Sequence, residues 1–297
     1  MVGIGDAVET AARPSGWRRL RRGLAACPPL VSACALWLAV AVGVALVTEL
    51  ISPYHYAQID LRARLQPPVL LGGEWRHALG TDELGRDVMS RLFYSIRMSL
   101  LVALLGTAIG AVLGTMLGFL AAHFRGWIDD LIMVLVDFQA SMPFIIIALS
   151  VLAFFGSSLT LFIALMGLFG WERYARLVRG MTLSAKEHGY AVAIRQLGAS
   201  PWRVYSRHIL PNIASALIVN VTLNFPEHII LETGLSFLGL GVQPPLTSLG
   251  NMVGYGREYL QSAWLIAVFP GIAIVLTTLS MSIVGDWIRD RLDPTLR

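Results

Sequence analysis

Three carboxylates lie within long apolar segments, where an ionisable side chain can act on a polar solute. Asp137 lies in one such segment, and Glu227 and Glu232 lie five residues apart in another. Charge inside a bilayer is costly, so acids at such positions commonly line the passage of an ion or a polar molecule. They can equally be buried between helices beside a polar or arginine partner. Both interpretations stay open here: acids that line a pathway, or acids that join helices.

The composition shows what kind of element must position these acids. Of 297 residues, 56% are hydrophobic and only 14% are charged, whereas a soluble domain has about 25% charged residues. The apolar residues come in runs long enough to cross a bilayer as helices, which takes about 20 residues each. We predict an all-α membrane protein with six transmembrane helices, at about 30–47, 99–122, 131–155, 159–177, 209–231 and 264–284.

The distribution of arginines predicts the orientation. They gather before the first helix, after the fourth and after the last, and the positive-inside rule makes that side the cytoplasm of an inner membrane. Both termini are then cytoplasmic. Because the arginines flank apolar runs, the net charge of +4 indicates membrane anchoring and no nucleic-acid partner. The chain divides into a basic tail, a first transmembrane helix, an external segment, a five-helix membrane domain and a C-terminal tail, at 1–29, 30–51, 52–96, 97–286 and 287–297.

The sequence lacks motifs for a cofactor or for catalysis. Cys27 and Cys34 lie seven residues apart in one apolar stretch and do not have metal-ligand spacing. A phosphate-binding loop needs a lysine directly after a glycine, and Lys186, the only lysine, stands in no such pattern. Ser236 and His228 do not form a convincing nucleophile and base. We therefore expect no metal, no cofactor and no enzymatic activity, with any ATP hydrolysis on another subunit.

The polar segment 181–212, between the fourth and fifth helices, is too long for a simple connection. Apolar residues recur in it at helical spacing, Gly198 can cap that helix, and Ser200 with Pro201 can start a second one. The segment therefore predicts two short helices joined at a bend, on the cytoplasmic side. They can lie on the bilayer surface as an interfacial pair, or project as a docking site for a cytoplasmic partner.

This segment resembles the EAA loop of permease subunits in binding-protein-dependent ABC importers. Ala193, Gly198, Leu210 and Pro211 fall in register with that motif, while Val192 stands where the family has a glutamate. The resemblance implies that the loop fits a groove of a cytoplasmic ATPase, with either Glu187 or apolar packing in place of the missing acid. The residues expected at or near this contact are Lys186, Glu187, Tyr190, Val192, Ala193, Arg195, Gly198, Arg203, Leu210 and Pro211.

Three further blocks, at 77–87, 235–245 and 285–294, resemble the C-type permease subunit of dipeptide, oligopeptide and nickel transporters. The resemblance implies a type I ABC importer permease fold with a cytoplasmic coupling-helix loop. The implied substrate is a di- or oligopeptide, or else nickel or another small solute. The implied partners are a second permease subunit in a heterodimer, two ATP-binding subunits, an external substrate-binding protein and the lipid bilayer. Asp82, Arg86 and Asp87 are candidates for contact with the binding protein, or else form a capped loop.

A glycine repeat predicts how one of the helices packs. The second predicted helix has a glycine at every fourth residue, at Gly106, Gly110, Gly114 and Gly118. This repeat predicts close packing against a neighbouring helix.

A secondary transporter driven by an ion gradient is the alternative class of function. Inverted repeats or paired broken helices would support that alternative, and the sequence shows neither clearly.

Overall fold

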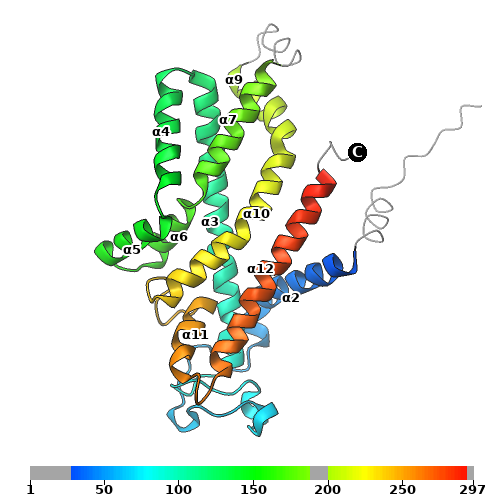
Figure 1. The fold of residues 1–297 in the computed structure, drawn as a ribbon. Helices are drawn as coiled ribbons and strands as arrows, with labels where there is room; N and C mark the ends of the chain where they lie inside the picture. Colours follow the sequence, from blue (N-terminus) through cyan, green and yellow to red (C-terminus); the bar gives the residue numbers. More distant parts are fainter. Residues whose placement is uncertain (1–27, 188–199, 293–297) are drawn as a thin grey trace, which may run out of the picture.

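The structure is a computed structural model that describes residues 28–187 and 200–292, and it is built from helices (Figure 1). Within those residues, four helices are long and apolar enough to cross a membrane: α2 (Pro29–Ile51), α3 (Val88–Phe124), the helix Tyr205–Phe237 and α12 (Leu265–Leu292). A bent pair of helices makes a fifth span if it is counted as one. The predicted all-α membrane class is confirmed, whereas length and composition identify four or five of the six predicted spans.

The predicted third helix, 131–155, is wrong as a single straight span. It consists of α4 (Trp127–Ser141) and α5 (Phe144–Phe155), which meet at an angle of 88°. Pro143 explains the break, because proline has no N–H for the helix and forces the residue before it out of helical conformation. Met142 is accordingly extended, with φ −94° and ψ 132°.

The predicted fourth helix, 159–177, is also broken. It consists of α6 (Leu159–Gly167) and α7 (Trp171–Glu187), with Gly170 between them at φ 79°. Glycine adopts this left-handed conformation without a steric cost. Since α7 continues to Glu187, the first residues of the predicted loop 181–212 are helical. On the other side of that loop, α9 (Pro201–Val204) continues through the π-helical turn η4 (Tyr205–Ile209) into α10 (Leu210–Phe237).

The predicted start of the second helix, at residue 99, is wrong by eleven residues. α3 begins at Val88, where the Asp87 side chain accepts a hydrogen bond of 2.8 Å from the Ser90 amide and caps the helix. The segment between α2 and α3 therefore ends at residue 87, whereas the predicted boundary is 96. α12 likewise extends past the predicted end at 284, to Leu292. At 1.5 Å per residue α3 is about 55 Å long, so it extends beyond the hydrocarbon core.

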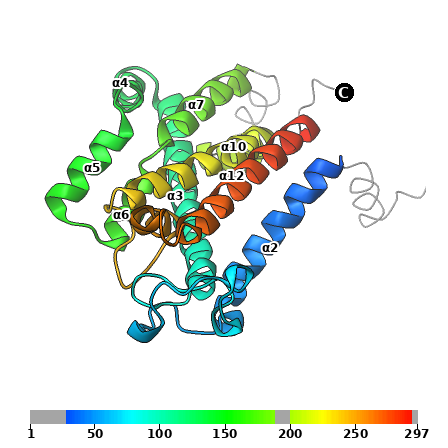
Figure 2. The ribbon, with the colours of Figure 1, turned by 60° about the horizontal axis from the view of Figure 1, so that its bottom comes forward.

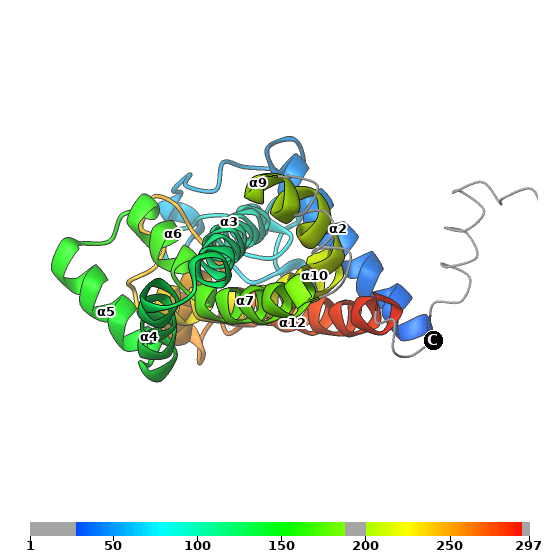
Figure 3. The ribbon, with the colours of Figure 1, turned by 90° about the horizontal axis from the view of Figure 1, so that it is seen from above.

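The four glycines of α3 face α6 and α7, as the four-residue repeat predicts. A Cβ added to Gly118 would lie 2.6 Å from the Ala175 carbonyl oxygen, and one added to Gly106 would lie 2.7 Å from the Met166 Cβ. The helices are thus packed with backbone against backbone. Figure 3 looks down from the end that carries α9 and shows α7 between α4 and α10, with α3 against its side.

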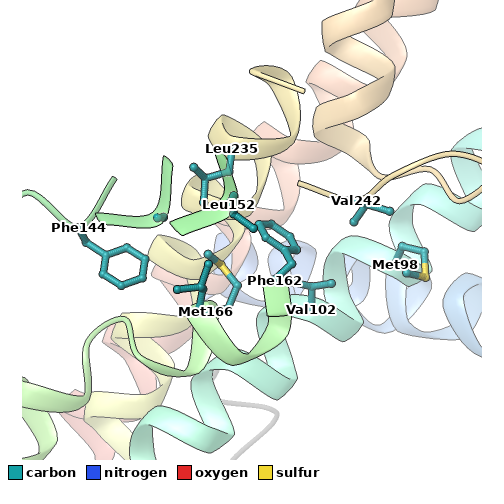
Figure 4. Close-up of a cluster of buried hydrophobic side chains, with 10 residues drawn as sticks. Met98, Val102, Phe144, Leu152, Phe162, Met166, Leu235 and Val242 are labelled. Atoms are coloured by element: carbon teal, nitrogen blue, oxygen red, sulfur yellow. The ribbon is translucent and has the colours of Figure 1, made fainter. Parts of the chain in front are cut away.

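A hydrophobic cluster holds the two broken spans against α3 and α10 (Figure 4). Its labelled members are Met98 and Val102 of α3, Phe144 and Leu152 of α5, Phe162 and Met166 of α6, Leu235 of α10, and Val242. On the other side of the bundle, α2 packs beside α12, far from α4 and α5 (Figure 2). The Trp37 indole N–H donates a 3.2 Å hydrogen bond to the Thr277 hydroxyl and joins these two helices.

Short elements close the end of the bundle opposite α9. They are the 3₁₀ turns η1 (Leu61–Ala63), η2 (Val69–Leu71), η3 (Trp75–His77) and η5 (Arg257–Tyr259), and the helix α11 (Leu249–Gly256). We call this end of the molecule the α11 end, and the end where α7 finishes and α9 starts the α9 end (Figure 1). The polar clusters of the candidate site lie at one of these two ends or along α7.

Candidate functional site

One face of α7 is exposed from Arg173 to Ser184 and carries polar or small residues. Arg173, Arg176, Gly180 and Ser184 are exposed and follow one another at spacings of three, four and four residues, which places them on one side of a helix. Tyr174 and Val178, on the side toward α3, are fully buried. An exposed arginine is costly against lipid tails, so this α7 face is suited to water or to another protein surface.

The two arginines of this face are each paired with an acid from a flanking helix. Arg173 Nη1 lies 2.6 Å from a Glu227 carboxylate oxygen and 2.8 Å from the Asn224 amide oxygen, both on α10. Arg176 Nη2 lies 3.0 Å from a carboxylate oxygen of Asp137 on α4. Glu227 and Asp137, two of the predicted pathway acids, therefore lie beside the exposed face of α7, each with an arginine partner. The face carries two positive and two negative charges.

A third arginine of α7 has a more buried partner. Arg179 forms two hydrogen bonds, of 2.6 and 2.7 Å, with the carboxylate of Asp129 at the start of α4. Two parallel N–H to oxygen bonds fix the geometry of both side chains. This bidentate pair holds α4 against α7 near the α9 end. None of these three arginines was predicted as a site residue. Arg173 and Arg176 lie in the predicted span 159–177 and Arg179 just beyond it, and their regular spacing of three residues is the signal that could have identified them.

Glu232, the third predicted pathway acid, is enclosed between helices. Its side chain is fully buried, and its two carboxylate oxygens accept hydrogen bonds from Ser99 (2.9 Å) and Ser236 (2.7 Å). The Ser99 hydroxyl oxygen also accepts a hydrogen bond of 3.1 Å from the backbone amide of Leu249. Glu232 therefore joins α3, α10 and α11, which is the second of the two roles considered for an intramembrane acid.

Asp82 and Asp87, two of the candidates for contact with a binding protein, have almost fully buried side chains. Asp82 accepts hydrogen bonds of 2.9 Å from the backbone amides of Leu84 and Arg86, and its carboxylate pairs with the Arg86 and Arg91 guanidiniums. The Arg86 side chain is only 16% exposed. These charges pair with one another between the loop and the first turns of α3, as in a capped loop.

The buried charges around Asp82 also contact the loop before α11 through hydrogen bonds. The Arg91 guanidinium donates a 3.3 Å hydrogen bond to the Thr247 hydroxyl, which lies 3.2 Å from the Ser95 hydroxyl. Arg91, Ser95 and Ser99 are spaced by four residues on α3, so they form one polar line that faces the α11 region. The α11 end is therefore held by charge and hydrogen bonds as well as by apolar packing.

At the α9 end, Lys186 points back into the bundle. Its ammonium group donates a hydrogen bond to the Ala122 carbonyl of α3 and lies 5.5 Å from the centre of the Tyr205 ring. The Tyr205 hydroxyl in turn lies 2.9 Å from His123 Nδ1 of α3. A π-helical turn contains Tyr205, and such turns are frequent at functional sites. Lys186 is thus an internal contact of α3, α7 and η4 and does not lie on an open docking surface.

Of the other predicted coupling residues, the structure describes some, and the rest lie outside the described residues. Arg203 and Pro211 are exposed, and Leu210 is half-buried against the cluster that contains Val178 and Ile209. Glu187 is the last residue of α7. Outside the described residues lie Tyr190, Val192, Ala193, Arg195 and Gly198. Among the described residues, no group of three His, Cys, Asp or Glu side chains is placed to hold a metal ion.

Comparison with known proteins agrees with this architecture. The family model described as "Binding-protein-dependent transport system inner membrane component" matches residues 110–297. A chain of the MetNI methionine ABC transporter, in an inward-facing conformation, superposes with a TM-score of 0.55 over 69% of this chain and 97% of that one, at 20% sequence identity. This likeness shows the fold: that of an ABC importer permease.

The sequence relatives extend over almost the whole chain. The dipeptide transport system permease protein DppC of Escherichia coli K12 is 38% identical over 95% of this chain and 92% of its own length. The glutathione transport system permease protein GsiD of Pectobacterium atrosepticum is 36% identical over 95% and 90%, respectively. A di/tripeptide permease protein, DppC of Pseudomonas aeruginosa, is 36% identical over 88% and 87%. The chain therefore belongs to the binding-protein-dependent ABC transport permeases, as a non-catalytic, multi-pass component of the inner membrane.

Proposed function

We propose that this chain is one of two permease subunits, in a heterodimer, of an ATP-driven importer for di- and oligopeptides. The observation that carries the proposal is the polar, charge-compensated face of α7, because a passage for a polar solute needs such a surface within the membrane. The relatives named above are permeases for dipeptides, di/tripeptides and glutathione, and this supports a peptide substrate. Two ATP-binding subunits and an external binding protein complete the assembly.

The topology that fits this function has six crossings. The bent pair α4–α5 supplies one, and the pair α6–α7 supplies another whose second half is too charged to be recognised by hydropathy. Both termini and the loop 181–212 are then cytoplasmic, and the α11 end is external. Cysteine labelling with a membrane-impermeant reagent tests this orientation. A cysteine placed at Leu70, which is 88% exposed at the α11 end, should react from outside intact cells, and one placed at Arg203 should react only after permeabilisation.

The loop 188–199 with its flanking residues is proposed to couple the ATPase to the passage. Replacing Gly198 by leucine should leave membrane insertion intact but detach or uncouple the ATPase subunits. Co-purification of the ATPase and uptake of peptide are the two measurements. Normal values of both in Gly198→Leu would contradict the coupling role.

The transport reaction itself is tested in proteoliposomes that contain both permease subunits and both ATPases. With binding protein and labelled Ala-Ala outside and ATP inside, we expect uptake that stops when ATP is replaced by ADP. Uptake that persists without ATP and follows an imposed ion gradient would instead support a secondary transporter. Nickel is the second candidate substrate in this family, so uptake of Ni²⁺ but not of any dipeptide would overturn the assignment to peptides.

A further inference from the structure

Arg173, Asn224 and Glu227 form a cluster that lies deep within the span and is nevertheless open. Along α10, Glu227 is about 25 Å from Leu210 and about 15 Å from Phe237, at 1.5 Å per residue. The side chains of Arg173 and Glu227 are 45% and 43% exposed. The chain itself therefore leaves this pair uncovered at a depth where an uncovered pair facing lipid would be costly.

The cluster differs from the buried ion pairs of Asp129 and Asp82 in how its charges are held. Arg173 uses Nη1 for both Glu227 and Asn224, and its Nε is 3.9 Å from an oxygen of Glu172. By contrast, Asp129 and Asp82 lie in enclosed, multiply bonded pairs. A guanidinium with three oxygens around it keeps a partner when one of them leaves. Glu227 can therefore turn to another cation without leaving Arg173 unpaired.

The chemistry of the cluster matches a molecule with one positive and one negative end. A short peptide carries an ammonium group at one terminus and a carboxylate at the other at neutral pH. Its carboxylate can pair with the Arg173 guanidinium while its ammonium pairs with the Glu227 carboxylate. One internal ion pair is then exchanged for two intermolecular pairs. The pair Arg176–Asp137, one turn further along α7, offers the same exchange as a next step toward the α9 end.

We propose that Arg173, Asn224 and Glu227 form a charge-selective station that binds the ionised termini of a peptide during its passage. This inference rests on the proposed function, since it names how the same α7 face recognises its substrate. In the resting station the charges of Arg173 and Glu227 balance each other. Removing one member of the ion pair gives the station a net charge, and the passage then favours peptides of the opposite charge.

The test compares dipeptides of different net charge in the reconstituted complex with its binding protein. Labelled Glu-Glu, Lys-Lys and Ala-Ala are the probes, and the measured quantity is the uptake ratio of Glu-Glu to Lys-Lys relative to wild type. Glu227→Gln leaves an extra positive charge and should raise this ratio about three- to tenfold. Arg173→Gln leaves an extra negative charge and should lower it by a similar factor. The selectivity of the binding protein cancels, because it is the same in every comparison.

The isosteric double variant Arg173→Gln/Glu227→Gln provides the control for stability. It leaves neither member of the Arg173–Glu227 pair as a lone charge, so its amount in the membrane should be near wild type. Its ratio should return to the wild-type value while uptake of Ala-Ala falls about tenfold, because each terminus of the peptide loses a charged partner. Arg97→Gln is the matched control elsewhere on the chain. It breaks the exposed 2.8 Å pair with Glu49 and should leave the ratio unchanged.

The outcomes separate this inference from the function on which it rests. If the wild-type complex imports none of the three dipeptides, the proposed peptide function fails and the inference fails with it. If all three are imported and neither single variant shifts the ratio, or both shift it in the same direction, only the inference is overturned. If the single variants are lost from the membrane, the double variant decides, and wild-type uptake of Ala-Ala by it would show that the pair serves only to join α7 and α10.

Discussion

The contact between α3 and α7 makes a sharp prediction at Gly118. A Cβ built there would lie 2.6 Å from the Ala175 carbonyl oxygen, 2.9 Å from the Val178 Cβ and 3.1 Å from the Arg179 amide nitrogen. The first and third of these atoms belong to the α7 backbone, so they cannot rotate away. Gly118→Ala therefore forces the two helices apart by several tenths of an ångström. Such overpacking costs about 1–3 kcal/mol.

Two other glycines provide comparisons for the destabilisation expected at Gly118. At Gly110 the nearest atoms are carbonyl oxygens 3.2 Å away, and at Gly271 in α12 nothing lies within 4 Å. Alanine is favoured over glycine inside a helix by about 0.5–1 kcal/mol. Gly271→Ala should therefore stabilise by about that amount, Gly110→Ala should lie near zero, and Gly118→Ala should destabilise by about 1–2 kcal/mol after the same gain is subtracted.

Thermal unfolding of the purified chain in detergent measures the order of the three variants. A change of 1 kcal/mol moves the midpoint of a chain of this size by about 2–4 °C. We expect a decrease of roughly 2–8 °C for Gly118→Ala and an increase of roughly 1–4 °C for Gly271→Ala. If Gly118→Ala unfolds at or above the wild-type midpoint, the glycine repeat is not a close-contact surface and the reasoning about α3 and α7 is refuted.

Three further predictions concern the buried polar groups. Glu232→Ala leaves two buried hydroxyls without an acceptor and should lower the free energy of unfolding by about 2–4 kcal/mol, whereas Glu232→Gln, which keeps one acceptor, should lose less in the same thermal assay. Asp82→Asn leaves the buried Arg91 without its counter-charge and should cost about 3–5 kcal/mol, measured as faster proteolysis of residues 52–87. Asp60→Asn, which breaks an exposed 3.9 Å pair, should cost less than about 1 kcal/mol. Lys186→Met should lower the peptide uptake per ATP hydrolysed, and Lys186→Arg should lower it less. If both variants and the wild type take up the same amount of peptide per ATP hydrolysed, a coupling role for Lys186 is contradicted.

The sequence predicted helices well where their apolar part crosses a membrane, and less well at their ends. Hydropathy identifies the middle of α3 but not its first eleven residues, because Arg91 and Arg97 lower the average there. The cap of α3 is nevertheless local: Asp87 bonds the Ser90 amide three residues on, a relation visible in sequence. The breaks before Phe144 and Trp171 were visible as Pro143 and Gly170, but a run of apolar residues on both sides suggested one continuous helix.

The pairing of charges could not be predicted in the same way. Arg173 and Glu227 are 54 residues apart, and Arg179 and Asp129 are 50 apart, so each pair depends on how whole helices pack. The glycine repeat predicted that α3 has a close neighbour, but not that the neighbour is α7. Without that knowledge, an acid such as Glu232 could not be distinguished from one such as Glu227. The structure separates them by burial.

Described residues on either side of the segment 188–199 contact the same end of α3. Lys186, just before it, bonds the Ala122 carbonyl, and Tyr205, just after it, contacts His123. Under the proposed coupling role, a partner that displaces the segment would act on the end of α3 through both contacts. Because the glycine repeat holds α3 and α7 backbone to backbone, α7 has to follow, and Arg173 and Arg176 move with it. Their acids belong to α10 and α4, so both ion pairs change if α7 moves relative to these two helices, a movement that the Arg179–Asp129 pair opposes on the α4 side. In this arrangement, a force at the α9 end reaches the polar face of α7 through rigid helix contacts alone.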